Sequence, residues 1–581
     1  MKQHDLAALF NRMADLLEFR GENPFRIRAY RRAAMNLESF GGDLEELVAG
    51  GRLHELSGIG TDLAKKISEY CDTGKIAAIE QLLRRVPKGV FELLEVPGVG
   101  PKTARLLTDR LHVKSVEQLE AAAKAHRLQT LPGFHAKKEA NLLRGIEVLK
   151  RGRERLHLGI ALPLANEMLR FLRKVPGAAR VSTAGSLRRM KETIGDLDLL
   201  VASGSPGRIM AAFTGASFCA RVLAAGSTKA SILTRDGLQV DLRVIAPESF
   251  GAALQYFTGS KEHNVRLREL AARQGLKVNE YGVFRVKARR RVAGREEADV
   301  YGALGLPWIP PELREDRGEL EAAKAGRLPA LVEPKDLRGD FHAHTTWSDG
   351  TDRLEAMADA ASVKGYTYLA ICDHSRSLRV AHGMTVARLR QQMARIRALN
   401  QRARGLRLLM GAEVDILSDG SMDYPDSVLA DLDFVVGSIH SGFTQGEAVL
   451  TRRLVRAMRN PYVTLIAHPT GRMFGQREPY PVDLEAVFAT ANTTGTALEI
   501  NAYPRRLDLG DSAAHRARAL GVMLAISTDA HSTDQLDQMT FGLGVARRAW
   551  VEPRHLLNCL SLPQLRGWIA RKRQHVGGRA P

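Results

Sequence analysis

The sequence predicts a multidomain protein in which a helical N-terminal region precedes an α+β region and a C-terminal α/β region. Residues 1 to about 150 have a helical pattern that short glycine-containing turns interrupt. From about 155 to 245 short β-branched strands follow a helix, and from 337 onward apolar runs alternate with helical segments. That alternation is typical of repeated βα units, and hence of a parallel barrel or sheet. With 581 residues, the chain exceeds what one hydrophobic core organises.

The net charge suits a phosphate-rich partner. Lys and Arg number 85 against 65 Asp and Glu, which gives a formal charge of +20. Each phosphate that such side chains neutralise releases a condensed counterion, so association with nucleic acid is favoured. Many basic proteins are merely soluble, however, so the charge supports a motif without replacing one.

Cysteine usage and hydropathy predict a cytoplasmic chain. The four cysteines are scattered without a CxxC spacing, which favours neither a disulfide framework nor a thiolate zinc site. The N-terminus has the pattern of a charged amphipathic helix rather than a signal peptide. No stretch approaches the ~18–20 apolar residues of a membrane span, so no membrane partner is expected.

Two glycine-containing turns in the helical region share one pattern. They are Leu56-Ser57-Gly58-Ile59-Gly60 and Val96-Pro97-Gly98-Val99-Gly100. Glycine lets the backbone approach a ligand and adopt a positive φ, and the amides of the following helix then face an anion. One such turn alone is an ordinary helix–helix connection, but two copies predict helix–hairpin–helix motifs that bind a DNA backbone without reading bases. A third segment, 131–135, lacks the second glycine and is a degenerate copy.

The α+β region contains few elements that the pattern defines clearly. We expect a helix around 161–174 and strands near 179–184, 196–201 and 238–245. Residues 246–315 have a mixed pattern with a helix near 262–274, and the charged segment 312–336 indicates a linker or a connecting helix.

Paired carboxylates mark two of these strands. Alternate residues of a strand share a face, so Asp196 and Asp198 point together, and Asp241 lies opposite the apolar face of its own strand. Three carboxylates on adjacent strands can hold two divalent ions, one of which lowers the pKa of a 3′-hydroxyl while the other binds a triphosphate. An isolated DxD more often ends a strand on a solvated face. Here it follows a Gly185-Ser186 turn whose amides and hydroxyl suit phosphate oxygens.

Residues 1–315 resemble the family X DNA polymerases, the group that includes DNA polymerase beta. The resemblance covers the carboxylate strands, the Gly185-Ser186 turn and the segment Tyr256-Phe257-Thr258-Gly259-Ser260. It implies that the three aspartates are catalytic metal ligands. It also implies nucleotide or base-pair contacts at Gly185, Ser186, Arg189, Tyr256, Phe257, Gly259, Asn264 and Arg268, and Glu280 falls where the family keeps a Glu. Lys261 stands where the beta enzyme has Asp, which leaves the nucleotide contact at that position open.

A lysine in the first helical domain has two interpretations. The family's N-terminal domain often removes a 5′-deoxyribose phosphate through a lysine Schiff base, and Lys66 stands at that lysine's position. Arg26 and Tyr30 match residues around the 5′-phosphate, whereas Asp62 and His54 replace lysines that would help to hold it. Because an aspartate repels phosphate, a solvated helix lysine and a lyase nucleophile are equal alternatives for Lys66.

Histidines and carboxylates recur at the ends of apolar runs in the C-terminal region. The runs lie near 367–372, 407–412, 433–439, 463–467, 497–500 and 522–527. The side chains are His342, His344, Asp349, His374, Glu413, His440, His468, Asp529 and His531, and only the Asp349 loop does not follow a run or a likely strand. Side chains at the C-terminal ends of barrel strands converge on one mouth. Such a set would repel and crowd there unless metal ions bind it, and mixed imidazole and carboxylate ligands suit zinc, manganese or iron.

This pattern resembles the PHP (polymerase and histidinol phosphatase) domain, a distorted (β/α)7 barrel, over about residues 337–575. All nine ligand positions of that family match, which implies an active metal-dependent phosphoesterase rather than an inherited scaffold. The resemblance implies one ion held by His342, His344, Glu413 and Asp529, a second by Glu413, His440 and His468, and a third by Asp349, His374 and His531. Up to three divalent ions, Mn²⁺ or Zn²⁺, are expected there.

These patterns divide the chain into six expected segments. They are a lyase-like helix–hairpin–helix domain (1–80), a second helix–hairpin–helix subdomain (81–152), a nucleotidyltransferase palm (153–245), a nucleotide-selection thumb (246–315), a linker (316–336) and the PHP domain (337–575).

As a whole the chain resembles a bacterial family X DNA polymerase with an appended PHP domain. The resemblance implies short-gap filling in base excision repair with Mg²⁺ or Mn²⁺, and a 3′–5′ exonuclease in the PHP domain, with abasic-site cleavage or 3′-phosphate removal as further options there. Gapped or primer–template DNA and dNTPs are the expected partners of a monomeric, nucleoid-associated protein. One alternative is a DNA-binding PHP phosphoesterase whose polymerase half only positions DNA, and another is a scaffold with both sites vestigial.

Overall fold

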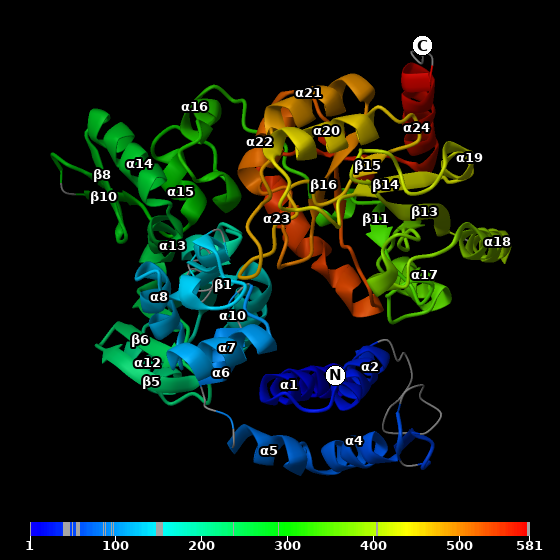
Figure 1. Cartoon of the computed structure of the whole chain (residues 1–581). Coiled ribbons are helices and arrows are strands. Elements are labelled where there is room, and N and C mark those ends of the chain that lie inside the picture. The colour runs from blue at the N-terminus through cyan, green and yellow to red at the C-terminus, as the bar shows by residue number, and fades with distance from the viewer. Residues whose placement is uncertain are drawn as a thin grey trace.

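The computed structural model describes residues 2–577, apart from residues 39–46, 49, 54–58, 85, 87, 88, 95, 97, 137, 144, 147–154, 236, 289, 403 and 404. Four regions follow one another along the chain: N-terminal helices, a palm built on a mixed sheet, a small thumb, and a barrel of parallel strands (Figure 1). No helix in the described part of the chain is long and apolar enough to span a bilayer.

The N-terminal region is helical, as the sequence predicts. Its helices are α1 (Lys2–Arg20), α2 (Pro24–Glu38), α4 (Thr61–Thr73), α5 (Ala77–Arg84), α6 (Gly89–Leu94), α7 (Pro101–Leu111) and α8 (Val116–Lys124). Their apolar faces form one hydrophobic core. Gly60 precedes α4 and Gly100 precedes α7, both in extended conformation, and Pro101 occupies the first position of α7, where its missing N–H costs nothing. Gly98 has a φ of +89°, which explains the need for glycine in that turn.

The palm combines helix α10 (Leu158–Arg173) with a five-stranded sheet in the order β2-β4-β7-β6-β5. The strands are β2 (Arg180–Thr183), β4 (Asp196–Ala202), β5 (Cys219–Ala225), β6 (Lys229–Thr234) and β7 (Gln239–Ile245), with short helices α11 (Gly185–Arg188) and α12 (Pro206–Thr214). A two-residue pair, β1 (Leu156–His157) and β3 (Thr193–Ile194), lies beside it. Strands β5 and β6 were not predicted, because β5 is an exposed edge strand whose residues show no apolar alternation.

The thumb packs two helices against a three-stranded sheet. Its elements are α13 (Phe250–Thr258), α14 (Lys261–Arg273), β8 (Leu276–Asn279), β9 (Gly282–Arg285), β10 (Arg290–Ala293) and α15 (Glu297–Gly302). The segment expected as a linker contains helix α16 (Glu319–Lys324), and its Leu320 and Ala323 belong to the thumb's own core. Buried Glu319 lies 2.6 Å from His263 of α14, so this segment is packed onto the thumb rather than spanning free solvent.

Seven parallel strands in sequence order form the barrel. They are β11 (Gly339–Ala343), β12 (Tyr368–Ile371), β13 (Arg407–Asp415), β14 (Phe434–Ser438), β15 (Leu465–Ile466), β16 (Ala497–Asn501) and β17 (Leu524–Ser527). A bridge between Ala343 and Ala530 brings the last strand back to the first, so the sheet is nearly closed. The helices are α17 (Leu354–Val363), α18 (Val386–Arg402), α19 (Asp426–Leu429), α20 (Glu447–Met458), α21 (Leu484–Thr494), α22 (Asp511–Ala519), α23 (Met539–Arg548) and α24 (Leu562–Gly577). The predicted fold class is confirmed.

The palm and the barrel share a continuous hydrophobic core that includes Leu158 of α10 and Leu543 of α23. Polar contacts cross the same boundary: Arg472 lies 2.9 Å from Glu192, and Arg548 donates to the carbonyl of Arg189 at 2.8 Å. The palm and the barrel are therefore parts of one packed body.

Candidate active sites

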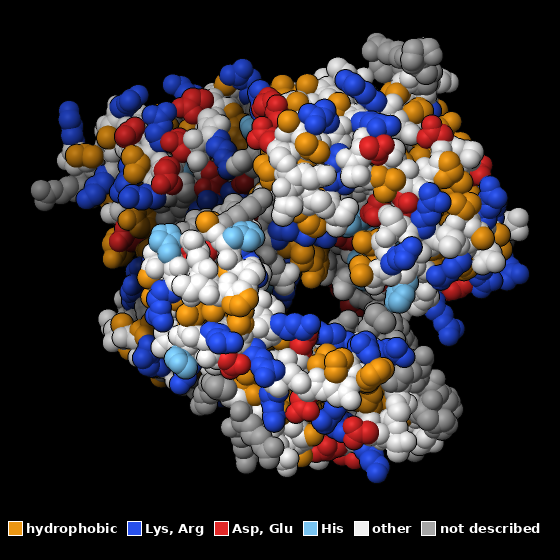
Figure 2. Space-filling view, viewed as in Figure 1, with side chains coloured by type: hydrophobic (Ala, Val, Ile, Leu, Met, Phe, Trp, Pro, Cys, Tyr) orange, Lys and Arg blue, Asp and Glu red, His pale blue; other side chains and the backbone are white. Residues whose placement is uncertain are grey.

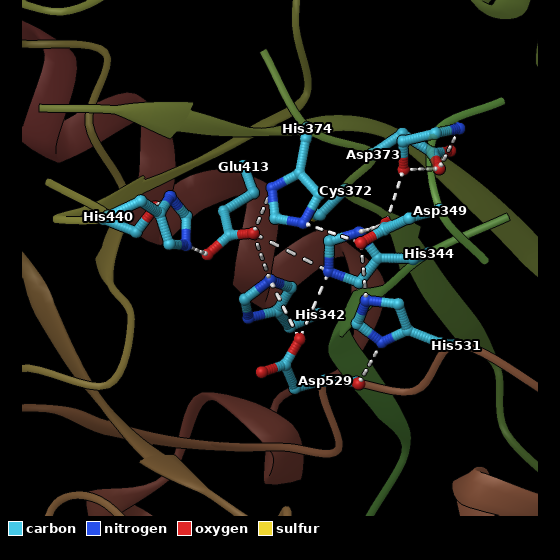
Figure 3. A network of polar contacts seen from close by, with 12 residues as sticks. His342, His344, Asp349, Cys372, Asp373, His374, Glu413, His440, Asp529 and His531 are labelled. Atoms are coloured by element: carbon cyan, nitrogen blue, oxygen red, sulfur yellow. Dashed lines mark hydrogen bonds and ion pairs between the residues drawn. The ribbon is translucent and has the colours of Figure 1, made fainter. Parts of the chain in front are cut away.

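The metal-ligand candidates of the barrel converge at the C-terminal ends of the strands: Figure 3 shows eight of the nine, and the ninth, His468, lies 3.0 Å from Glu413. His342 and Glu413 lie on β11 and β13, and the others follow directly after strands or, for Asp349, lie in the loop after β11. His342, His344 and Glu413 have side chains that are at most 1% exposed. Ionisable groups of this kind are almost never buried together unless something compensates their charge and hydrogen-bonding needs.

Glu413 lies at the middle of this centre and contacts five histidines. Its Oε2 lies 2.8 Å from His374 Nδ1, 3.4 Å from His342 Nε2 and 3.7 Å from His344 Nε2. Its Oε1 lies 3.0 Å from His468 Nε2 and 3.2 Å from His440 Nε2. A carboxylate whose two oxygens face different imidazoles is placed to bridge two ions.

Three groups of ligand atoms, each within 4.8 Å of one another, define the positions that ions could take. They are His344 with Asp349, His374 and His531; His342 with His344 and Asp529; and His374 with Glu413 and His440. The last group differs from the expected assignment, because His374 joins Glu413 and His440 where the resemblance implied His468. His468 nevertheless lies against Glu413, so the predicted residues are brought together, although they are grouped differently from the expectation.

The chemistry of the centre fits divalent ions. Nε2 of His342 and both ring nitrogens of His344 are buried without a hydrogen-bond partner among the described residues, and His374 Nδ1 and Glu413 Oε2, although 2.8 Å apart, do not meet in hydrogen-bonding geometry. Buried polar atoms without partners are costly, and several of them aimed at one point are explained when a cation accepts their lone pairs. Imidazole with carboxylate suits zinc, manganese or iron, so the donor set does not select among them.

A second layer of acceptors orients the imidazoles. His342 Nδ1 lies 2.9 Å from Glu499 of β16, His440 Nδ1 lies 2.6 Å from Asp415 of β13, and His531 Nδ1 lies 2.8 Å from the carbonyl of Asp529. Each contact favours a proton on Nδ1 and leaves Nε2 to face the centre. Sequence reasoning missed Glu499 and Asp415; the only available signal was a charged residue inside an otherwise apolar strand.

Buried carboxylates also fix the loop that carries His344. Asp373, which is fully buried, accepts hydrogen bonds from Thr345 N at 2.8 Å and from Ser348 Oγ at 2.6 Å. Asp340 accepts from Thr528, and burial raises its pKa to about 6. These carboxylates connect neighbouring strand ends through hydrogen bonds.

The surroundings within the centre keep one imidazole neutral and one carboxyl group ionised. Burial and the neighbouring His531 and His374 lower the pKa of His344 to about 4, so this imidazole is neutral and able to ligate. Burial alone would raise the pKa of Asp349, but hydrogen bonds from His374 and His531 lower it instead. Asp349 is therefore a carboxylate at neutral pH.

The palm carboxylates occupy adjacent parallel strands. Asp198 of β4 is paired in register with Asp241 of β7, so their side chains share a face, and Asp196 lies two residues before Asp198 on the same face. Burial, with Asp196 and Asp241 adding to it, raises the pKa of Asp198 to about 7. Burial alone would raise the pKa of Asp241, but hydrogen bonds from Ser231 and Gln239 and the nearby Lys229 lower it. Among the described residues, groups of three ligands within 4.8 Å occur only in the barrel, so the palm site is the looser of the two.

The Gly185 turn closes against the carboxylates. Gly185 has a φ of +59°, and a Cβ there would lie 2.2 Å from Asp198 Oδ2. Only glycine fits this approach, which brings the start of α11, with Ser186, beside the carboxylate pair.

Residues expected to bind nucleotide are assembled around α13 and α14. Arg189 donates to the carbonyl of Thr258 and, at 2.9 Å, to Glu315, which places its guanidinium beside Gly259. Asn264 donates to the carbonyl of Tyr256 at 2.7 Å, and Arg268 Nε donates to the carbonyl of Asn264. Tyr256 and Phe257 meet edge to face. Tyr256, Arg268 and Glu280 line one pocket of the thumb.

The N-terminal predictions have mixed outcomes in the structure. Gly60, Gly98 and Gly100 lie in the turns before α4 and α7, whereas Gly58 and His54 lie outside the described residues. Tyr30 is 1% exposed and its ring meets Phe10 in the helical core, so it does not face a solvent-borne phosphate. Lys66 forms an ion pair of 2.5 Å with Asp62.

Together, the fold and the two sites define a class: a polymerase-beta-like nucleotidyltransferase joined to a PHP metal-dependent domain. Family models match in the same order along the chain, as a helix–hairpin–helix domain (1–76), a SAM-like helix–hairpin–helix tandem (90–147), a DNA polymerase beta thumb (253–315) and a PHP domain (340–482). The chain is 39% identical to the DNA polymerase/3′-5′ exonuclease PolX of Bacillus subtilis (strain 168), over 98% of this chain and 100% of that protein. It belongs to the family X DNA polymerases with a C-terminal PHP domain.

Further similarities are partial. A probable phosphatase of Thermoanaerobacter sp. (strain X514) is 26% identical over 41% of this chain and 97% of that protein. A solved ternary complex of Leishmania infantum polymerase beta is 24% identical and covers 40% of this chain and 100% of that chain, with a TM-score of 0.27 that supports no argument.

Proposed function

We propose that this chain is a DNA-directed DNA polymerase that fills short gaps in base excision repair and carries a 3′–5′ exonuclease in its barrel. The observation that carries the polymerase half is the in-register pairing of Asp198 with Asp241 beside the Gly185 turn. The nuclease half rests on the convergence of nine histidine and carboxylate ligands, eight of them in the three groups described above and His468 against Glu413. Membership of the family and the name of the Bacillus relative support both halves.

In the palm, Asp196, Asp198 and Asp241 would hold Mg²⁺ or Mn²⁺. When bound, such ions lower the pKa of a hydroxyl and neutralise charge on the phosphates. The chain's own residues bind and orient the substrate: Ser186 and the amides of α11 face phosphate oxygens, and Arg189 lies beside them with its guanidinium held by Glu315. The 3′-oxygen forms a bond to the α-phosphorus of the dNTP, and pyrophosphate leaves.

In the barrel, the nine ligands would hold up to three divalent ions, Mn²⁺ or Zn²⁺. In 3′-end hydrolysis the oxygen of water bonds to the phosphorus of the terminal phosphodiester and the bond from phosphorus to the 3′-oxygen of the preceding nucleotide breaks, which yields a nucleoside 5′-monophosphate and a strand with a new 3′-hydroxyl. His342 and His440 are held by Glu499 and Asp415 so that their Nε2 atoms face the reaction. Cleavage at abasic sites or removal of a 3′-phosphate would use the same residues, since each is a phosphoester hydrolysis.

The surface is compatible with gapped or primer–template DNA as the partner. Figure 2 shows a hollow between the N-terminal helices and the rest of the molecule, with Lys and Arg side chains along its border. Positive side chains beside a concave surface favour binding of a phosphate backbone. We take the protein to act as a monomer in the cytoplasm, in association with the nucleoid.

One experiment tests both activities: primer extension and 3′-end degradation on a one-nucleotide-gapped duplex, with Mn²⁺ or Mg²⁺. Asp198→Ala is expected to lose synthesis and keep degradation, and His344→Ala to do the reverse. If the wild type adds no nucleotide with either ion, the polymerase proposal is wrong.

A second candidate function follows from the looser palm site. Because only the barrel brings three ligands within 4.8 Å among the described residues, the chain could be a DNA-binding phosphoesterase whose polymerase half positions the DNA. The same assay separates the two, since this candidate predicts degradation without synthesis and an Asp198→Ala variant that matches the wild type.

A further inference from the structure

The last residue of α23, a helix of the barrel, contacts the part of the palm that carries a candidate triphosphate ligand. Arg548 donates through Nη1 to the carbonyl of Arg189 and to Oε1 of Glu315, at 2.8 Å each. The same Glu315 oxygen accepts from Nε of Arg189 at 2.9 Å. One carboxylate at the end of the thumb therefore connects an arginine of the barrel to an arginine of the palm.

This contact is enclosed. The side chain of Arg548 is 3% exposed, that of Glu315 is 10% exposed and that of Arg189 is 11% exposed. Burial alone would raise the pKa of Glu315, but Arg548 and Arg189 lower it, so its carboxyl group is ionised at neutral pH. Ion pairs shielded from solvent are screened little by salt, and removal of one partner leaves a buried charge uncompensated. The position of each guanidinium thus depends on the other.

Further barrel residues hold the same stretch of the palm, residues 189–192. Gly544, one turn earlier in α23, has no Cβ, and a Cβ there would lie 3.1 Å from Cβ of Met190. Glu192 accepts from the backbone N of Asp511 at 3.2 Å. The barrel therefore fixes this stretch at three successive points, through the carbonyl of its first residue, the side chain of Met190 and the carboxylate of Glu192.

The guanidinium of Arg189 is held so that one end stays available. Its Nε donates to Glu315 and its Nη1 to the carbonyl of Thr258. In the part of the chain that the structure describes, its Nη2 has no hydrogen-bond partner. A phosphate oxygen is the acceptor that a planar guanidinium recognises best, and a side chain already held in place loses little freedom when it binds.

Arg548 also sets how much positive charge remains for a phosphate. Its Nη2 donates to Asp511 Oδ2 at 2.6 Å, and Arg317 lies 3.2 Å from the same oxygen. Three guanidinium groups thus share two carboxylates, which leaves one positive charge in excess. Without Arg548, Glu315 would neutralise Arg189 in a one-to-one pair, and an enclosed site would strengthen that neutralisation.

We propose that Arg548 of the barrel is a positioning residue for nucleotide addition in the palm: it holds Arg189 in place and keeps the charge of that arginine available for the triphosphate of the incoming dNTP. This inference rests on the proposed polymerase function. It goes beyond that function because it makes nucleotide binding depend on a helix of the nuclease domain. Arg548 acts through Arg189 and does not itself contact the nucleotide.

A double-mutant cycle in the full-length protein tests this role, by primer extension on a one-nucleotide-gapped duplex with Mg²⁺ or Mn²⁺. Arg548→Ala should raise KM for the dNTP about 10-fold, the loss expected for one hydrogen bond to a charged group. Its kcat should stay within about threefold of the wild type, because lost ground-state binding raises KM alone. Arg189→Ala should raise KM further. Addition of Arg548→Ala to Arg189→Ala should then change KM little, because the first acts through the second.

The matched control is Arg547→Ala. Arg547, the neighbouring residue of α23, pairs with Glu312 at 2.7 Å and donates to the carbonyl of Val332. Its removal takes the same charge from the same helix without a contact to residues 189–192, so KM should match that of the wild type. Degradation of 3′ ends reports that each variant is folded.

A wild-type KM in Arg548→Ala, an equal rise of KM in Arg547→Ala, or additive effects of the two substitutions in the cycle would each overturn the proposal. If Arg548→Ala also loses degradation, Arg548→Gln replaces it, because glutamine keeps more of the packing and lacks the charge. A raised KM in Arg548→Gln supports the proposal, and a wild-type KM overturns it.

Failure of the polymerase function itself gives a different result. A wild type that adds no nucleotide contradicts the polymerase, and equilibrium binding of a dNTP to the gapped-DNA complex then tests Arg548 without turnover. Weaker dNTP binding in Arg548→Ala than in the wild type would still support its role, and equal binding would overturn it.

Discussion

The palm and the barrel both place acidic side chains at strand positions that share one face, yet they enclose them differently. Asp196 is exposed and Asp198 and Asp241 are half-buried, with Asp241 tied to Gln239 at 3.0 Å and to Lys229 at 3.5 Å. In the barrel, His342, His344 and Glu413 are buried, and their partners in the next layer are in place.

The difference indicates two ways of using metal ions. A buried set with oriented imidazoles is preorganised, so its ions would be resident and would stabilise the fold. An open set of carboxylates that repel one another would gain its ions together with the triphosphate, whose oxygens would complete the coordination. Loss of a single ligand is therefore expected to lower the activity of the barrel more than loss of a neighbouring residue lowers the activity of the palm.

The largest effect should come from Glu413→Gln. Glutamine keeps the size of the side chain but removes the negative charge that faces five histidines, so the barrel should lose at least one ion and its 3′-end degradation should fall by about three orders of magnitude. Primer extension by the same preparation should be unchanged. Metal content by elemental analysis and the two activities measure this, and a Glu413→Gln protein with full metal and full degradation would contradict a resident centre.

A smaller loss is expected from Asp415→Asn, which leaves every ligand in place. Asp415 accepts from His440 Nδ1 at 2.6 Å and so fixes the tautomer of that ring. Loss of such a partner typically costs about 10- to 100-fold in metal affinity or activity. Degradation should fall by that factor, and excess Mn²⁺ should recover part of it. Asp419→Asn, a change at an exposed aspartate in the loop after β13, is the matched control.

The contrast between the sites also explains what the sequence could predict. Each barrel ligand could be found because it ends an apolar run, and strand ends in a parallel barrel meet at one mouth whatever the details of packing. Asp196, Asp198 and Asp241 could be found because alternation along a strand fixes which side chains share a face.

Other parts of the sites carried no such signal. Glu499 and Asp415 act through contacts with His342 and His440, which lie on or after other strands, so the pattern of a single strand does not show them. The edge strand β5 was missed because an exposed strand needs no apolar period, whereas β6, which lies between β5 and β7, is mostly buried and was missed all the same. The grouping of His374 with Glu413 and His440 depends on ring orientation, which is set by packing and not by spacing.

The crowded negative charge of the palm should affect how the free energy of unfolding depends on pH when no metal is bound. Burial and the neighbouring Asp196 and Asp241 raise the pKa of Asp198 from its ordinary value of 3.8 to about 7, so the contribution of its proton to stability is full below pH 3.8 and is lost as the pH rises through 7. Asparagine resembles the protonated form. In the presence of a chelator, Asp198→Asn should therefore gain about 2 kcal/mol over the wild type between pH 5 and pH 8.

The control for this prediction is Asp241→Asn. The pKa of Asp241 is lowered, so its carboxylate contributes stability above its unfolded pKa, and that contribution is lost as the pH falls. Between pH 5 and pH 8 Asp241 is ionised in both the folded and the unfolded state, so its own titration adds no pH dependence there, and Asp241→Asn should gain less stability with rising pH than Asp198→Asn does. Denaturant unfolding at the two pH values measures both, and parallel behaviour of the two variants would refute the assignment of strain to Asp198.

The smallest effects are expected at Lys66, which offers a test of whether a third site exists at all. Its ammonium is bound to Asp62 one turn away in α4, at 2.5 Å, and nothing in the described N-terminal helices resembles the unpartnered, converging groups of the barrel. Such an i,i+4 pair contributes only about 0.3–0.5 kcal/mol, so Lys66→Ala should change stability by that amount and leave both activities intact.

An amine held in an ion pair is a poor nucleophile, because Schiff-base formation needs its free lone pair. Borohydride trapping on incised abasic DNA should therefore give little adduct with the wild type and more with Asp62→Asn. The neighbouring Lys65 should not contribute to the adduct. If the wild type and Asp62→Asn give equal adduct, and the adduct is lost in Lys66→Ala but kept in Lys65→Ala, Lys66 is a lyase nucleophile despite its ion pair. An active site in this chain would then not require the burial and the unpartnered groups that mark the barrel centre.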